Sequence, residues 1–171
     1  MKLRRHLRPE AICLDLETRR IPEGEDAGDF DPESPRNLER IREQTLEELT
    51  ALLDRTGEVP NVRRLFREFH ERVKRAGTAI GQGVAVPHVR TLQVKTFVMA
   101  FARSREGLPF DAPDGEPVHL FFAMAAPPYD DRTYLKVYKS LAKTLLTPDV
   151  IEQLIAADDP DKILFILKGV D

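Results

Sequence analysis

Histidines are the side chains of this 171-residue chain that can act as bases or nucleophiles near neutral pH, and His88 has the most constrained setting of the four. It follows Pro87 in GTAIGQGVAVPHVR (residues 77–90), where a glycine-rich approach leads into an apolar run. The proline fixes its own φ and restricts Val86, so the backbone that presents the imidazole is stiff. We expect a short strand ended by Pro87-His88, and a rigidly held ring at a strand end suits a nucleophile.

The other candidate residues favour structural roles. His6 lies in a basic terminal segment and His70 follows Phe69 in a predicted helix, so both are expected at or near the surface. His119 falls in an apolar run and is expected to be a satisfied core or edge residue. The lone Cys13 excludes an internal disulfide framework and a multi-cysteine zinc site, and we expect no metal and no organic cofactor.

Two predicted helices precede the histidine segment and can bring cations to it. Ser34-Pro35 has the form of an N-cap followed by proline at the first helical position, and Gly57 ends that helix. A second helix follows Pro60 and ends at Gly77. Its polar face carries six basic residues, Arg63, Arg64, Arg67, Arg72, Lys74 and Arg75. A solvated face explains most of these charges, yet several arginines lie close enough in sequence to serve an anionic group at His88.

The remaining elements predict the fold class. Strands are expected at residues 11–16, 94–102 and 117–125, and three helices after Pro127-Pro128, the last two at 148–156 and 160–168. The order of strand, two helices, several strands and three helices predicts one α/β domain over residues 1–171, with a mixed β-sheet flanked by helices. Within residues 22–34, the stretch Glu23–Glu33 holds six acids and no base, so we expect an acidic surface loop there.

Composition and charge exclude several classes of function. With 42 % hydrophobic residues, the chain is too apolar for a disordered protein. The 26 basic residues against 29 acidic ones give a net charge of −3, so no global basic field for nucleic acid exists. Its apolar runs are far shorter than the ~20 residues of a membrane span, and its basic start leads into no apolar signal region. We therefore expect a cytoplasmic protein with no nucleic-acid partner and no direct membrane insertion.

Two blocks of the sequence together resemble a known family. Residues 77–90 are similar to the active-site segment TGIG-x-GIAIPHG[RKT] of enzyme IIA of the bacterial phosphoenolpyruvate-dependent sugar phosphotransferase system, in its type 2 (fructose, mannitol and nitrogen-regulatory) branch. Residues 107–127, GLPFDAPDGEPVHLFFAMAAP, resemble the downstream block GI-x-F-x-APDG-x-PV-x-L-[IV]-F-x-LAAP of that family. The resemblance covers most of residues 10–170.

The resemblance implies a phosphoryl carrier. By it, His88 is the phosphoryl acceptor, while Arg72, Thr78 and Arg90 fall on the family's arginine, threonine and later basic residue. The group would come from phosphohistidine on an HPr-like carrier and pass to an enzyme IIB, or remain as a nitrogen-regulatory mark. Arginines can clamp the phosphoryl oxygens bidentately, and the Thr78 hydroxyl and backbone N–H groups of residues 81–83 can donate as well.

Several positions depart from the family pattern. Val89 replaces the glycine after the histidine, and a β-branched residue disfavours a positive φ. Val73 replaces the glutamate of an Arg-Glu pair. Tyr134 occupies the position of a second histidine in many relatives, but a phenol with a pKa of about 10 cannot share protonation at neutral pH. Tyr134 either donates a hydrogen bond to the phosphoryl group or only packs in the fold. These departures are compatible with phosphorylation of His88, but not with the usual residues for passing the group on to a partner.

The alternative is a non-enzymatic regulatory or binding module. It would keep the fold and use the surface round His88 to dock a partner, without passing phosphate onward. The expected partners are an HPr-like carrier and an enzyme IIB domain or a regulatory target protein. A modest apolar rim round His88 would suit transient docking to any of them.

Overall fold

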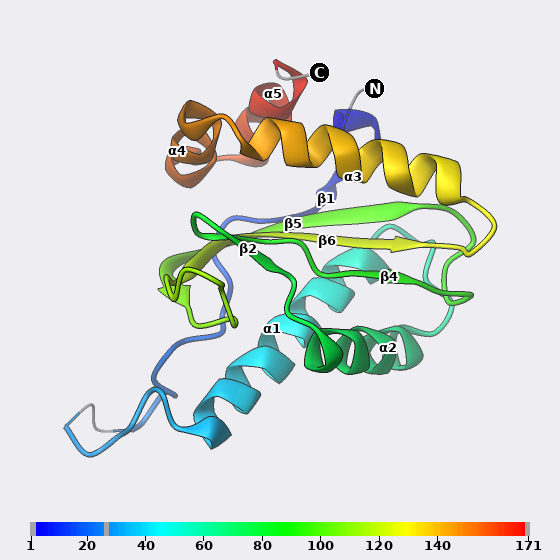
Figure 1. Cartoon of the computed structure of the whole chain (residues 1–171). Coiled ribbons are helices and arrows are strands. Elements are labelled where there is room, and N and C mark those ends of the chain that lie inside the picture. The colour runs from blue at the N-terminus through cyan, green and yellow to red at the C-terminus, as the bar shows by residue number, and fades with distance from the viewer. Residues whose placement is uncertain (1–2, 26–27, 170–171) are drawn as a thin grey trace.

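The computed structural model describes residues 3–25 and 28–169 and is an α/β domain built on a mixed sheet of six strands. Helices α1 (Pro35–Asp54) and α2 (Val62–Arg75) cover one face of this sheet. Helices α3 (Asp131–Leu145), α4 (Pro148–Ala156) and α5 (Pro160–Lys168) cover the other (Figure 1). The predicted fold class is therefore confirmed.

The strands are β1 (Leu7–Cys13), β2 (Ala79–Gly81), β3 (Val84–Ala85), β4 (His88–Arg90), β5 (Val98–Leu108) and β6 (Val118–Ala126), after a short 3-10 helix, η1 (Leu3–Arg5). The sheet order is β1-β5-β6-β3-β2, and β4 also pairs with β6. β6 is buried along nearly all its length because strands flank it and helices cover both faces.

The central strand sets the position of the histidine segment. β4 runs parallel to β6, with His88 opposite Met124 and Arg90 opposite Ala126. On its other side β6 pairs with β5 in antiparallel register, Met99 opposite Met124. α2 packs against β4, so its last turn lies beside the strand that carries His88. The sheet core thus fixes the histidine segment from β6, and α2 covers it.

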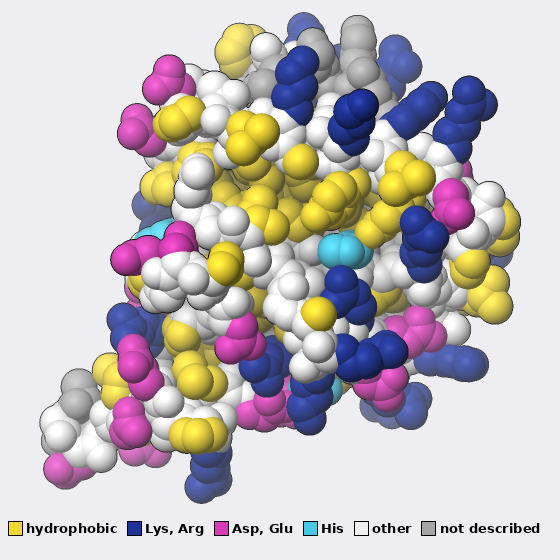
Figure 2. Space-filling view, in the orientation of Figure 1, with side chains coloured by type: hydrophobic (Ala, Val, Ile, Leu, Met, Phe, Trp, Pro, Cys, Tyr) yellow, Lys and Arg dark blue, Asp and Glu magenta, His cyan; other side chains and the backbone are white. Residues whose placement is uncertain are grey.

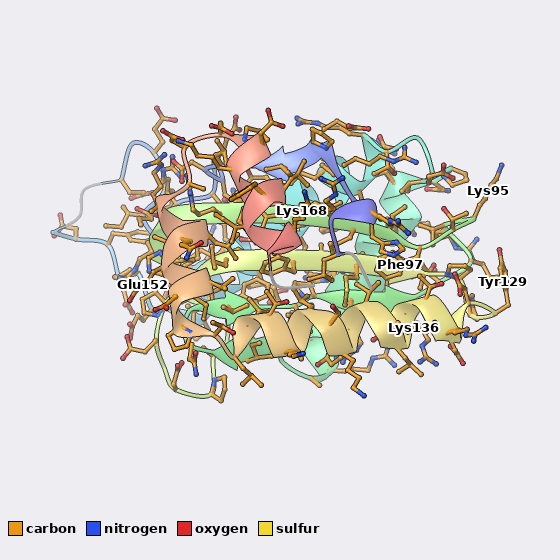
Figure 3. All side chains as sticks on the ribbon, turned by 90° about the horizontal axis from the view of Figure 1, so that it is seen from above. Lys95, Phe97, Tyr129, Lys136, Glu152 and Lys168 are labelled. Carbon is orange, nitrogen blue, oxygen red and sulfur yellow. The ribbon has the colours of Figure 1, made fainter. Side chains whose placement is uncertain are left out.

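The helix boundaries follow the capping chemistry of the sequence. The Ser34 side chain accepts a hydrogen bond from Asn37 N, and Pro35 is the first helical residue of α1, as predicted. Asn61 caps α2 in the same way, through Arg64 N. α4 and α5 span 148–156 and 160–168, as expected from the proline at each start. Seen from above, α3 lies along the sheet, with Tyr129 near Lys95 at one end (Figure 3).

Two predicted strands are misplaced along the chain. The strand expected at 11–16 is β1, Leu7–Cys13, whose exposed residues 8–10 include Pro9. An edge strand tolerates such a proline, and β1 is an edge of this sheet. The strand expected at 94–102 is β5, Val98–Leu108, which continues through polar residues because Arg103 is buried, only 1 % exposed.

The setting of His88 also differs from the prediction. β3 ends at Ala85, before Pro87, and His88 begins a separate strand, β4. Pro87 lacks an N–H and cannot continue the ladder, although its carbonyl still accepts from Met124 N at 2.9 Å. His88 is therefore the first residue of a strand rather than the last. Among the helices of residues 3–25 and 28–169, none combines the length and the apolar composition that crossing a bilayer requires.

Candidate functional site

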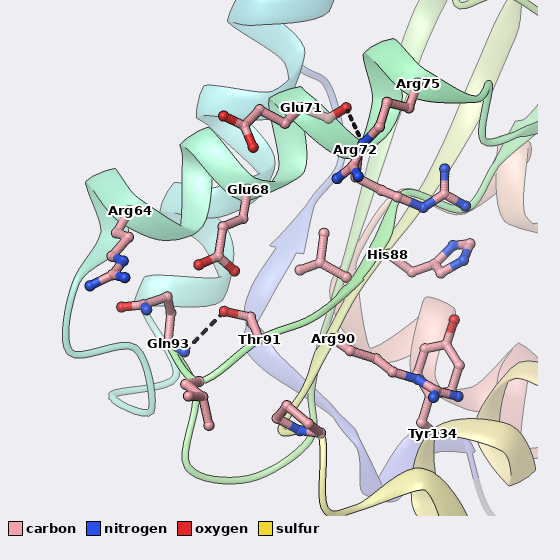
Figure 4. Close-up of a pocket in the computed structure, with 13 residues that line it drawn as sticks. Arg64, Glu68, Glu71, Arg72, Arg75, His88, Arg90, Thr91, Gln93 and Tyr134 are labelled. Atoms are coloured by element: carbon pink, nitrogen blue, oxygen red, sulfur yellow. Dashed lines mark hydrogen bonds between the residues drawn. The ribbon is translucent and has the colours of Figure 1, made fainter.

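His88 lies in an open pocket of about 650 Å³ between α2, the segment of residues 88–93 and the start of α3 (Figure 4). Arginines from two sides enter this pocket, Arg72 from the last turn of α2 and Arg90 from β4. The Tyr134 ring closes it on the α3 side. Three of the predicted site residues thus meet His88 in one place.

The imidazole of His88 is oriented by a backbone carbonyl. Its Nδ1 lies 2.7 Å from Val86 O. A carbonyl oxygen can only accept, so Nδ1 carries the proton and donates. Nε2 then keeps its lone pair, and it has no hydrogen-bond partner among the described residues. The neutral ring is therefore held as the tautomer whose free nucleophilic atom is Nε2.

The electrostatics keep this ring neutral. His88 is half-buried, and desolvation lowers its pKa below the ordinary 6.5. The hydrogen bond to Val86 O opposes that shift, while the positive charges of Arg72 and Arg90 lower the pKa further. At neutral pH the imidazole is consequently the unprotonated base that can attack phosphorus.

The two arginines are held in different ways. Arg72 Nη1 donates to Ala76 O at 3.1 Å, which places its guanidinium beside the end of α2. Arg90 Nη1 lies 3.0 Å from Asp131 Oδ1, and its Cζ lies 4.8 Å from the centroid of the Tyr134 ring. Arg90 is therefore positioned by an exposed ion pair and a cation–π contact together.

Two tyrosines of α3 pack round the imidazole. The Tyr134 and Tyr138 ring centroids lie 5.9 and 5.5 Å from that of His88. Tyr134 is only 8 % exposed, and burial raises the pKa of its phenol, which stays neutral. Tyr134 was among the predicted site residues, whereas Tyr138 was not. Its spacing four residues later on a predicted helix was the available signal.

Thr78 and the glycine loop do not line this pocket. Thr78 is buried, and its Oγ1 has no hydrogen-bond partner in the described structure. Its carbonyl accepts a hydrogen bond from Val86 N at 2.9 Å, so Thr78 contacts the residue that orients His88 rather than His88 itself. The N–H of Gln82 donates to Asp114 Oδ2 at 2.9 Å, because the loop forms the tight β2–β3 turn. Residues 81–83 are not among the residues that line the pocket of His88.

The structure explains two of the departures from the family pattern, Val89 and Val73. Val89 is an ordinary residue of β4, 6 % exposed, and the positive φ angles among described non-glycine residues belong to Gln82 and Asp111 alone. The expected conflict at Val89 is therefore absent. Val73 is 3 % exposed and belongs to the core under α2.

One cluster away from the pocket brings metal-ligand types together. Single ligand atoms of Glu39, Glu43 and His70 lie within 4.8 Å of one another. Glu39, however, already pairs with Arg42 and lies 3.6 Å from Lys74 Nζ. These cations lower the pKa of Glu39 and neutralise its charge. The cluster is therefore an ion-pair network between α1 and α2.

Comparison with known proteins identifies the family to which the chain belongs. Residues 37–170 match the family model for the phosphoenolpyruvate-dependent sugar phosphotransferase system, EIIA 2. A fructose-specific EIIABC component of Bacillus subtilis is 32 % identical over 137 residues, 79 % of this chain but 21 % of that protein. A nitrogen regulatory protein of Bradyrhizobium diazoefficiens is 33 % identical over 127 residues, 74 % of this chain and 82 % of the relative. The chain thus spans about a fifth of the Bacillus protein.

Solved structures share the fold. The crystal structure of nitrogen regulatory protein IIA-Ntr from Neisseria meningitidis has a TM-score of 0.78 and 29 % identity, covering 98 % of this chain and 99 % of the other. A complex of enzyme IIA and phosphorylated enzyme IIB for mannitol from Escherichia coli contains a chain with a TM-score of 0.68 and 21 % identity, covering 95 % and 99 %. With a family match over residues 37–170, this chain belongs to the EIIA 2 family of the phosphoenolpyruvate-dependent sugar phosphotransferase system.

Proposed function

We propose that His88 accepts a phosphoryl group on Nε2 from phosphohistidine of an HPr-like carrier. The Nε2 lone pair forms the new P–N bond as the P–N bond of the donor breaks, and the donor nitrogen keeps that electron pair. The proton on Nδ1 stays in its hydrogen bond to Val86 O throughout. No oxidant, metal or nucleotide takes part in this step.

The observation that carries this proposal is the 2.7 Å contact between His88 Nδ1 and Val86 O, in the pocket that Arg72 and Arg90 enter. It supports one tautomer, fixed before the donor arrives, so no proton needs to move when the group transfers. Arg72 and Arg90, which enter the pocket on either side of the ring, then supply positive charge where the phosphoryl oxygens would lie.

In this proposal the neighbouring residues have separate tasks. Arg72 and Arg90 bind the equatorial oxygens of the loose transition state, a task for which the guanidinium fork is suited. Tyr134 packs beneath Arg90 and keeps water from one side of the ring. Thr78 positions Val86 through their backbone hydrogen bond and so acts on His88 indirectly.

Relatives favour two fates for the phosphoryl group. The mannitol enzyme IIA is described in complex with a phosphorylated enzyme IIB, which supports an enzyme IIB as acceptor here. Two relatives aligned over 82 % and 99 % of their own lengths are nitrogen regulatory proteins, which favours a regulatory target instead. We propose that the chain works in the cytoplasm, as a carrier whose phosphorylated state is read by one of these partners.

The test is phosphorylation in vitro. The protein is incubated with phosphoenolpyruvate, enzyme I and HPr, and acid-labile phosphate is measured on wild type, His88→Ala and His119→Ala. The proposal expects equal labelling of wild type and the His119 variant, and none of the His88 variant. Unlabelled wild type, or a labelled His88→Ala protein, would refute it.

A further inference from the structure

We propose that the protein docking over His88 presents an acidic segment to the exposed face of α2, with carboxylates that meet Arg64 and Arg75. This inference rests on the proposed function of His88, because the same pocket holds both. It adds a stated chemistry for the partner and two contact residues outside the reacting site.

One face of α2 forms a wall of the pocket. Arg64, Glu68, Glu71, Arg72 and Arg75 all line it, and their spacing places them along a single side of the helix. The side chains of this wall are drawn in Figure 4, where Arg72 lies nearest His88 and Arg64 lies at the far end. Arg75 comes eleven positions after Arg64, which corresponds to about 16 Å along the helix axis.

The arginines of this wall lack acidic partners. Arg64, Arg72 and Arg75 form no ion pair with any described residue, whereas Arg42 of α1 binds both Glu39 and Asp111. Arg75 Nε approaches only the carbonyl of Glu71, at 3.4 Å. Figure 2 shows basic side chains gathered on this face next to an apolar band. The positive charge of Arg64 and Arg75 is therefore available to a partner.

The geometry favours a protein segment over a small anion. Arg64 and Arg75 are exposed and lie at the two ends of the wall, so no single phosphate reaches both. Glu68 and Glu71 lie between them and repel an anion at the centre. A chain that carries several carboxylates can contact both ends of the wall at once, which a single phosphate cannot do. Leu92, 76 % exposed on the opposite rim, offers the apolar contact that such a segment also needs.

Arg63 provides a matched control. It is exposed on the same helix, next to Arg64, and it carries the same charge. It lines a different groove, with Phe66 and Glu47, between α1 and α2. A charge reversal at Arg63 changes the net charge of the protein as much as one at Arg64 does, but leaves the His88 pocket unaltered.

The first experiment needs no phosphorylation. Hexaglutamate peptide, inorganic phosphate and hexalysine are each titrated into the protein, and NMR follows the arginine Nε–H signals. An extended six-residue peptide spans about 20 Å, enough to reach both ends of the wall. We expect hexaglutamate to shift Arg64 and Arg75, and Arg64→Glu and Arg75→Glu each to weaken its binding about fivefold or more. Arg63→Glu should behave as wild type.

The second experiment measures transfer. Rates of His88 phosphorylation are compared for phospho-HPr of the same organism and for phosphoramidate, which needs no protein contact. Arg64→Glu and Arg75→Glu should lower kcat/KM for the protein donor about tenfold at low salt and leave the phosphoramidate rate unchanged. Circular dichroism and thermal unfolding verify that each variant is folded.

The outcomes separate the two proposals. Hexaglutamate binding that Arg63→Glu weakens as much as Arg64→Glu does would overturn the inference, as would inorganic phosphate that shifts the signals of Arg64 and Arg75 as strongly as the peptide does. The inference would also be overturned if phospho-HPr phosphorylated Arg64→Glu and Arg75→Glu at the wild-type rate. A wild-type protein that neither donor phosphorylates instead refutes the proposed function, while the peptide titration still decides the docking surface.

Discussion

The imidazole of His88 is locked by the carbonyl of Val86, two residues earlier in the chain, at 2.7 Å from Nδ1. The intervening Pro87 makes this short-range contact possible, because its fixed φ turns the chain without a donor of its own. The same Val86 donates its N–H to Thr78 O at 2.9 Å, so the residue that orients the ring is itself held by the segment just before β2. The free atom of the ring is consequently Nε2.

The pH dependence of phosphorylation follows from the lowered pKa of His88. Burial, Arg72 and Arg90 disfavour the imidazolium, so the reactive neutral form persists below the ordinary pKa of 6.5. On the acid side, the rate with phosphoramidate should reach half of its plateau value at a pH below 6.5. NMR titration of the ring should show Arg72→Gln raising the pKa of His88. A wild-type pKa above 6.5 would contradict this account.

Arg72 should matter for its shape as well as its charge. Arg72→Ala is expected to slow phosphorylation of His88 about 10²-fold, because a charge-assisted donor to the transferring oxygens is lost. Arg72→Lys keeps the charge but loses the bidentate fork, so a smaller loss of about tenfold is expected. Single-turnover rates measure both. Rates equal to wild type in both variants would remove Arg72 from the site.

Tyr134 is expected to act by packing. Tyr134→Phe keeps the ring against Arg90 and His88 and should change the phosphorylation rate less than about threefold, since the neutral phenol supplies at most one weak hydrogen bond. Tyr134→Ala opens a cavity beside His88 and should cost about 3 kcal/mol in unfolding free energy. Chemical denaturation and transfer kinetics test the pair. A large loss of rate in Tyr134→Phe would assign the hydroxyl a direct role.

Asp131 should compete with the phosphoryl group for Arg90. Their 3.0 Å ion pair is exposed, so Asp131→Asn should change stability by less than about 1 kcal/mol. Freed from that pair, Arg90 can turn to the phosphoryl oxygens, and hydrolysis of phosphorylated His88 should slow about twofold to fivefold. ³¹P NMR follows the hydrolysis. Faster hydrolysis in this variant would mean that Asp131 supports the clamp instead.

Arg103 should stabilise the fold from outside the site. It is 1 % exposed, and its Nη1 donates to the carbonyls of Leu154, Ile155 and Ala157 at the end of α4. Arg103→Ala leaves these carbonyls without a donor and should cost about 3 kcal/mol or more. The exposed Arg105 is the control, and its alanine variant should lie within about 0.5 kcal/mol of wild type. Urea unfolding compares them.

Local chemistry made part of this structure predictable. Ser34-Pro35 fixes the start of α1 through capping, and the apolar run of β6 needs cover on both faces. The Pro-His step singled out the His88 ring, and helix periodicity placed a group of arginines on one face of α2. The individual choice of Arg72, Arg90 and Tyr134 came from the family resemblance instead. Arg72, Arg90 and Tyr134 do meet in the pocket of His88.

Other features depend on contacts between distant segments. β5 continues through Arg103 because α4, some fifty residues later, supplies carbonyls for its guanidinium. The Arg90–Asp131 ion pair joins β4 to α3, and no periodic pattern in the sequence predicts it. Thr78 was expected in the site from resemblance alone, yet its side chain is buried and does not line the pocket of His88. Single-sequence patterns carry no information on such pairings.

The most direct test of the central claim is the identity of the phosphorylated atom. The protein with ¹⁵N-labelled histidine is phosphorylated by phospho-HPr, and long-range ¹H–¹⁵N correlation spectra assign the phosphorus-bearing ring nitrogen. The account predicts one phosphohistidine, at Nε2 of His88, with Nδ1 still protonated. Phosphate on Nδ1 of His88, or on another residue, would contradict it.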